Sequence, residues 1–200
     1  MNENQFTMRT RAIFHKDTHR LLLEKVWNEE LPKATICMSN AGIMPSIYHM
    51  DYTTLFCINA LSSLGYGSCC IVNLFSFMTP KLNLSGDLAE LTCPENYEQI
   101  VTHASESDTF IWALGSIGQT YKKVLPFQAK LFDSLRPFAE KIFVIADASG
   151  REGLHPLSPS LRNKPWELVP FALPAPTADK TESEAKDGKP APTNKPKKKE

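Results

Sequence analysis

The stretch SCCIVNLFSF, residues 68–77, decides the fold class of this 200-residue chain. Its apolar character is broken only by Asn73, so both faces of the segment are expected to be covered, as in an interior strand of a parallel sheet. Three further runs of this kind are KATICMSN (33–40), DTFIWALG (108–115) and KIFVIADAS (141–149). These four runs are the predicted core strands.

Helical patterns occupy the gaps between the core strands. Asp51 is placed to cap a helix whose apolar stripe runs from Leu55 to Leu64. A second helix is predicted after Pro94, and helical material over 119–141 is expected to break or kink at Pro126. Strand and helix therefore alternate, which predicts an α/β domain with a four-stranded, mainly parallel sheet flanked by helices.

Two more strands are predicted before the first core strand. Residues 11–15 and 20–28 flank the polar residues 16–19, which can close a β-hairpin. We expect this hairpin to lie at the edge of the sheet.

The composition changes after Phe171. Residues 172–200 contain five prolines, a single leucine and no aromatic residue, so they cannot bury enough apolar surface to offset the entropy of ordering. The sequence predicts one domain over residues 1–171 and a disordered, Pro- and Lys-rich tail over 172–200. This tail is expected to be a solubilising extension, with contact to an acidic partner as the alternative.

Charge and cysteine usage narrow the function classes. The whole chain has 22 basic and 22 acidic residues, and the part before residue 172 has 15 basic and 17 acidic ones. This balance argues against a broadly basic nucleic-acid-binding face, although a local patch is compatible with it. The five cysteines form no CxxC pair, so we expect reduced core thiols and neither a metal nor a cofactor. No apolar run of 18 residues is present, which favours a cytoplasmic protein without a membrane partner.

Polar residues at the ends of the core strands are the candidate functional residues. Carboxyl ends of parallel strands share one edge, and ligands bind beyond it. Asn40 ends the first core strand, Asn73 interrupts the second, and His155 follows the fourth. Each of these residues alone could simply satisfy backbone groups. Their convergence at one edge favours a binding site.

The order of these segments resembles the family catalogued as domain of unknown function 1643. The similarity runs from Arg11 to Phe171 and is strongest over GYGSCCIVNLF, residues 65–75. The chain departs from the usual family pattern at Asn40-Ala41-Gly42, where Asn-Pro-Ser is usual, and at Trp112-Ala113-Leu114-Gly115, where Trp-Gly is usual. The family implies no activity.

The same segments are also similar, more distantly, to motifs of the uracil-DNA glycosylase superfamily. Those motifs are a strand ending in a loop with Asp or Asn, a Leu-Leu-Leu-Asn strand, a Trp-Gly strand end and a His-Pro-Ser-Pro loop. The matching residues here are Asn40, Asn73, Trp112 with Gly115, and His155 to Pro159, with Leu157 inserted before Ser158. The resemblance implies a glycosylase-like sheet whose rim pocket binds a nucleobase, nucleotide or nucleic acid.

This resemblance also implies roles for individual residues. His155 would act catalytically as a neutral donor to a base oxygen, and Asn40 would orient a water molecule. Asn73 would read the edge of the base. Asp51, Trp112, Gly115 and Ser158 complete the predicted substrate-binding set, although the position of Asp51 suits a helix cap better.

Three functions stay open at the level of sequence. The first is nucleobase or nucleotide binding in a rim pocket, with or without action on an N-glycosidic bond. The second is a non-catalytic binding or regulatory module, such as a phage or mobile-element accessory, because Asn40 cannot ionise as a carboxylate does. The third is an interaction protein whose Lys-rich tail is the working part.

Overall fold

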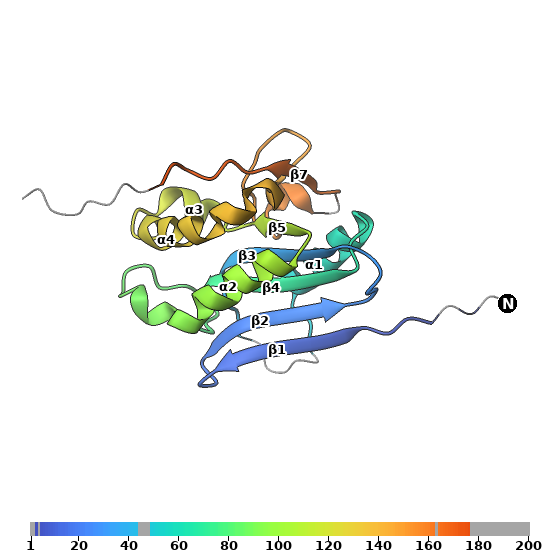
Figure 1. Cartoon of the computed structure of the whole chain (residues 1–200), viewed down its shortest axis with the longest axis horizontal. Helices are drawn as coiled ribbons and strands as arrows, with labels where there is room; N and C mark the ends of the chain where they lie inside the picture. The colour runs from blue at the N-terminus through green and yellow to red at the C-terminus, as the bar shows by residue number, and fades with distance from the viewer. Residues whose placement is uncertain (1–2, 4, 44–48, 163, 177–200) are drawn as a thin grey trace, which may run out of the picture.

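The computed structural model describes residues 3, 5–43, 49–162 and 164–176. The strands are β1 (Arg9–His15), β2 (His19–Val26), β3 (Lys33–Asn40), β4 (Ser68–Phe75), β5 (Thr109–Trp112), β6 (Ile142–Ala146) and β7 (Glu167–Pro170). The helices are α1 (Tyr52–Ser63), α2 (Pro94–Glu106), α3 (Ser116–Thr120) and α4 (Leu125–Leu135), with 3-10 turns at Ala89–Leu91, Arg136–Lys141 and Pro159–Leu161. All strands join one sheet in the order β1-β2-β4-β3-β5-β6-β7 (Figure 1).

The expected α/β architecture, with one sheet flanked by helices, is confirmed, but the predicted number of strands is wrong. The four predicted core strands form a parallel centre, β4-β3-β5-β6. The described sheet has seven strands because the β1-β2 hairpin joins β4 through an antiparallel pairing and β7 pairs antiparallel with β6, so three of its six strand pairings are parallel and three are antiparallel. The predicted hairpin is present, with β1 at the edge of the sheet. Its second strand, β2, is an interior strand because it pairs with both β1 and β4, and its leucines are buried.

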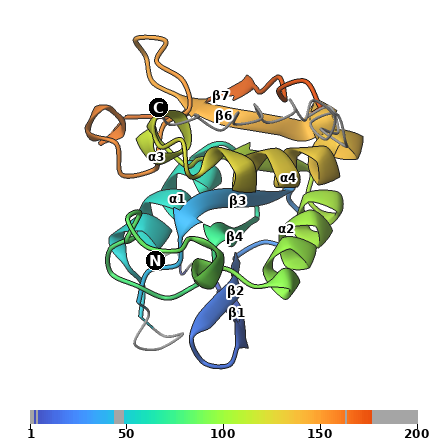
Figure 2. The ribbon, with the colours of Figure 1, turned by 90° about the vertical axis from the view of Figure 1, so that its left-hand side faces the viewer.

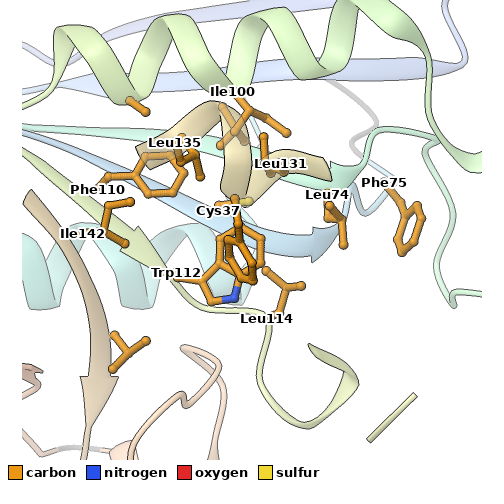
Figure 3. Packing of buried hydrophobic residues seen from close by; sticks show 14 of the residues in the cluster. Cys37, Leu74, Phe75, Ile100, Phe110, Trp112, Leu114, Leu131, Leu135 and Ile142 are labelled. Carbon is orange, nitrogen blue, oxygen red and sulfur yellow. The ribbon is translucent and has the colours of Figure 1, made fainter. Parts of the chain in front are cut away.

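Helices cover both faces of the sheet, and side chains alternate between the two layers. On one face, Cys69 and Ile71 of β4 pack with Leu61 of α1. On the other face, Val72 of β4 packs with Ile100 of α2 and with residues of α4 (Figure 3). Figure 2 shows α1 on one side of the central strands β3 and β4 and α2 on the other. This double covering explains why β4 is buried along its whole length.

The arrangement of connections creates a crevice at one edge. The neighbours β3 and β5 are parallel, and the chain leaves β3 toward α1 but leaves β5 toward α3 and α4 on the other face. Such a topological switch point opens a space beyond the carboxyl ends of the strands, where ligands bind in open α/β sheets.

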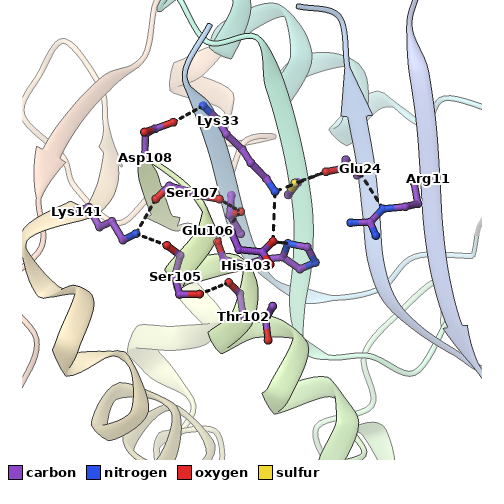
Figure 4. Close-up of polar contacts among 12 residues, drawn as sticks. Arg11, Glu24, Lys33, Thr102, His103, Ser105, Glu106, Ser107, Asp108 and Lys141 are labelled. Carbon is purple, nitrogen blue, oxygen red and sulfur yellow. Dashed lines mark hydrogen bonds and ion pairs between the residues drawn. The ribbon is translucent and has the colours of Figure 1, made fainter. Parts of the chain in front are cut away.

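A cluster of charged and polar side chains that pair with one another lies at the other end of the sheet, where the parallel strands β3 and β5 begin (Figure 4). The buried Glu24 carboxylate accepts from Arg11 at 2.9 Å and lies 3.7 Å from the Lys33 ammonium. The Lys33 backbone N–H donates to Asp108 at 2.8 Å, and Lys141 donates to two carbonyls at the end of α2. These contacts join β1, β2, β3 and α2, so we assign the cluster a structural role.

The chain continues in contact with the domain beyond the predicted boundary at Phe171. Leu173 packs against the core, and the Pro174 carbonyl accepts from the Arg136 guanidinium at 2.7 Å. The rest of the predicted tail, residues 177–200, lies outside the described residues.

Candidate functional site

A cavity of about 650 Å³ lies beyond the carboxyl ends of β3, β5 and β6. We call it the rim cavity. Ser39 of β3 contributes to it, and the segments that follow β5 and β6 supply most of the lining. The lining residues are Ser39, Leu114, Gly115, Ser116, Ile117, Gln119, Arg151, Glu152, Gly153, Leu154, His155 and Ser158. The structure thus brings together three of the predicted residues, His155, Gly115 and Ser158.

The imidazole of His155 has a defined hydrogen-bonding state. Its Nδ1 accepts from the backbone N–H of Leu157 at 3.1 Å, and burial lowers the pKa of His155. A neutral ring that accepts at Nδ1 carries its proton on Nε2. The backbone around it forms a turn, in which the Ser158 N–H donates to the His155 carbonyl at 2.8 Å. His155 therefore offers a fixed N–H donor in a residue that lines the rim cavity.

Gly115 allows the segment after β5 to pack on the His155 loop. Its φ is 65° and its ψ is −151°, a conformation that is nearly restricted to glycine. A Cβ atom at this position would lie 2.9 Å from the Cβ of His155. The glycine thus sets the distance between two walls of the rim cavity.

Asp147 organises the loop that leads from β6 to His155. Its carboxylate accepts from the backbone N–H and hydroxyl of Ser149, at 3.0 and 2.6 Å. It also accepts from the backbone and the guanidinium of Arg151, with a shortest distance of 2.8 Å. The Ser149 hydroxyl foremost, with help from Arg151, holds the pKa of Asp147 well below its ordinary value.

The stabilising effect of Asp147 is expected to depend on pH. Because its pKa is lower in the folded state, its contribution is fully present above the ordinary pKa of 3.8 and is lost as the pH falls through the folded-state value. Asp147→Asn is therefore expected to be less stable than the native chain at pH 6, with a smaller difference at pH 3. Urea unfolding at both pH values measures this. A difference that does not shrink on acidification would show that the carboxylate charge is unimportant.

Trp112 lies outside the rim cavity. Its side chain is buried, and its ring centroid is 4.7 Å from that of Phe132 (Figure 3 shows the packing of Trp112). It lines a second cavity, of about 350 Å³, between the sheet and α4. We call this the apolar cavity. Trp112 therefore contributes to packing and to this second space.

Asn40 and Asp51 are engaged in local structure. The Asn40 amide donates from Nδ2 to the Thr79 carbonyl at 3.2 Å, and its Oδ1 accepts from the Ser39 hydroxyl at 3.2 Å. Asp51 caps α1 by accepting from the Thr54 N–H at 2.7 Å. Asn40 adjoins the rim cavity through Ser39 but is not among the residues that line it.

Asn73 is fully buried in the middle layer of the sheet. It lies opposite Met38 of β3 and shares the α1 face with Cys69 and Ile71. Neither Oδ1 nor Nδ2 of its amide has a hydrogen-bond partner among the described residues. Like Asn40, it is not among the residues that line the rim cavity.

Sequence reasoning missed several residues of the rim cavity. Gln119 comes from α3, and Arg151 and Glu152 come from the loop after β6. Arg151 and Glu152 directly precede the GLHPLSP segment in the sequence, which is a signal that could have found them, whereas Gln119 is far from it along the chain and carried no such signal. Among the described residues, no group of three or more His, Cys, Asp or Glu side chains is arranged to hold a metal ion. None of the helices in the described part of the chain has the length and apolar character needed to cross a bilayer.

Comparison with known families places the chain in one of them. The family described as Protein of unknown function (DUF1643) matches residues 20–157, so the chain belongs to this family. Searches of curated proteins and of solved structures gave no match. The family expectation is thereby confirmed. The distant resemblance to the uracil-DNA glycosylase superfamily gains no support from these comparisons and stays a prediction.

Proposed function

We propose that the rim cavity binds a small ligand that carries a nucleobase. The observation that carries this proposal is the hydrogen bond from the Leu157 N–H to Nδ1 of His155, which leaves Nε2 as a donor. A carbonyl oxygen on a pyrimidine or purine ring is a suitable acceptor for such a donor. The donor is preorganised, because the backbone turn holds the ring before any ligand arrives.

The other groups around the rim cavity support a ligand with several polar edges. Hydroxyls of Ser39 and Ser158 and the amide of Gln119 can donate or accept, as base edges require. The volume of about 650 Å³ lies within the range of small-molecule sites. A free base, nucleoside or nucleotide is favoured over nucleic acid, because the Arg151 guanidinium is already paired with Asp147 at 2.8 Å.

Hydrolysis of an N-glycosidic bond is a second candidate function, which Glu152 favours. Glu152 lines the same cavity as His155, and its carboxylate would accept a proton from an attacking water while His155 stabilises the leaving base. Water would add to the sugar carbon as the bond to the base nitrogen breaks, and solvent would protonate the base. Asn40, the predicted water-orienting residue, has both ends of its amide engaged. Binding without release of base would instead favour the non-catalytic module.

Replacing His155 tests the proposed binding. A ligand present at 100 times its dissociation constant stabilises the native state by about 2.7 kcal/mol. We expect one member of a panel of bases, nucleosides and nucleotides to raise the melting temperature, and His155→Ala to abolish this shift. The exposed His49 is the matched control, since His49→Ala is expected to keep the shift. A panel without any effect, or an equal shift in the His155 variant, would refute the proposal.

A further inference from the structure

The rim cavity shares a wall with the apolar cavity. Leu114, Gly115, Gln119 and Gly153 line both spaces. Two of these residues are glycines with positive φ, 65° at Gly115 and 70° at Gly153. The shared wall is therefore thin, because the backbone passes between the cavities without side chains at these two positions.

The Gln119 side chain stands at the same wall. Its Nε2 lies so close to Gly153 that a Cβ atom added there would be 2.6 Å away. A glutamine side chain is flexible and polar, and it can rotate more easily than a packed backbone. Within the wall that the two cavities share, the Gln119 side chain is therefore the group that can move most easily.

The apolar cavity suits a different kind of chemical group from the rim cavity. Its walls include Trp112, Phe132, Val144 and Phe171. Its volume of about 350 Å³ compares with roughly 150 Å³ for an engineered apolar cavity that binds benzene. A ring or a branched chain of several carbons fits such a space.

The far wall of the apolar cavity is held in place. Pro174 and Ala175 line it, and the Arg136 guanidinium fixes this segment through the Pro174 carbonyl at 2.7 Å. Arg136 is itself bound to Asp133 at 3.1 Å. The segment after β7 therefore closes the space that α4 and the sheet leave open.

We infer that the ligand has two parts, a nucleobase in the rim cavity and an apolar substituent that enters the apolar cavity across Gly115 and Gly153. This inference rests on the proposed function for the polar part. The ligand class is a base or nucleoside with an alkyl or aryl group. Gln119 turns aside to admit the substituent.

Two series of alkylated bases test the inference, namely adenines with N6-methyl, N6-butyl and N6-hexyl groups and uracils with the same groups at C5. Each buried methylene is expected to improve the affinity about fourfold in one series. Calorimetry on the full chain measures the dissociation constants. Ala129 lines the apolar cavity, so Ala129→Phe is expected to remove the gain per methylene. Ala139 is the matched control position, because it is exposed in the 3-10 turn that follows α4 and does not line the apolar cavity. Ala139→Phe is expected to keep the gain in affinity per methylene.

The outcomes separate the inference from the proposed function. If an unsubstituted base binds and His155→Ala abolishes that binding, but affinity does not change with chain length, the two-part ligand is wrong and the proposed function stands. The same conclusion follows if Ala129→Phe and Ala139→Phe show equal gains. If neither series binds at any chain length, the two-part ligand is wrong, and the proposed function is judged by the panel of bases, nucleosides and nucleotides.

Discussion

Replacing Asn73 with Leu is expected to raise the free energy of unfolding by about 1–3 kcal/mol. Both polar atoms of the Asn73 amide are buried without a hydrogen-bond partner among the described residues. Such a group loses its hydration on folding and gains nothing in return. Leucine has a similar size and suits the apolar neighbours on the α1 face. Urea unfolding of the two proteins measures the difference.

Asn96 is the matched control for this substitution. It is also fully buried, but its Nδ2 donates to the carbonyls of Asn73 and Leu74 at 2.9 and 3.2 Å. Asn96→Leu is therefore expected to lower the stability, so the same exchange at two buried sites has opposite signs. If Asn73→Leu destabilises the chain as much as Asn96→Leu does, the Asn73 amide has a partner in solution, such as a bound water.

A stabilised Asn73→Leu variant also tests the role predicted for this amide. If the Asn73 amide contacts the ligand, its replacement by leucine is expected to weaken ligand binding even though the variant is more stable. The melting-temperature shift produced by the ligand of the native chain is the measurement. An unchanged shift would show that Asn73 is not a binding residue, and the proposed ligand site would then consist of the residues that line the rim cavity.

Gly115→Ala is expected to lower the stability by about 1–3 kcal/mol through backbone strain alone. The added Cβ would also lie 2.9 Å from the Cβ of His155, which is closer than two carbon atoms pack. Relief of this contact moves the His155 loop away from β5. We therefore expect the variant to lose the ligand-induced shift as well as stability, as measured by thermal unfolding with and without ligand.

Gly150→Ala is the control that separates the effect of backbone strain from the effect of the contact with His155. The φ of Gly150 is 78°, and no atom lies within 4 Å of a Cβ placed there. Gly150→Ala is expected to show a stability loss from strain while it keeps the ligand-induced shift. If Gly115→Ala also keeps that shift, the contact between Gly115 and His155 does not position the imidazole.

The parallel core of the fold could be predicted because its strands are continuous apolar runs. The predicted bounds of 33–40 match β3, and Asp51 caps α1 as its position suggested. β7 escaped prediction because Glu167–Pro170 is short and only partly buried, and within the described sheet it pairs with β6 alone. Four residues are too few to show a periodic pattern of apolar side chains, and the pairing of this strand depends on its tertiary contact with β6.

The candidate site was harder to predict than the fold. Strand order places Asn40, Asn73 and His155 at the same edge, but which of them share a space depends on the paths of the loops. The Asn40 amide instead donates to the carbonyl of Thr79, which is 39 residues away along the chain. Glu152 reaches the rim cavity because the Asp147 carboxylate folds the loop before it, a contact that spacing alone does not reveal.

The outermost strand β1 has a consequence for behaviour at high concentration. One side of its backbone has no neighbouring strand in the described sheet. Its register with β2 is irregular between Ile13 and Phe14, and Arg9 and Arg11 project charge along it. A bulged and charged margin of this kind opposes the docking of a strand from another molecule, so intermolecular β-aggregation is disfavoured at this end of the protein.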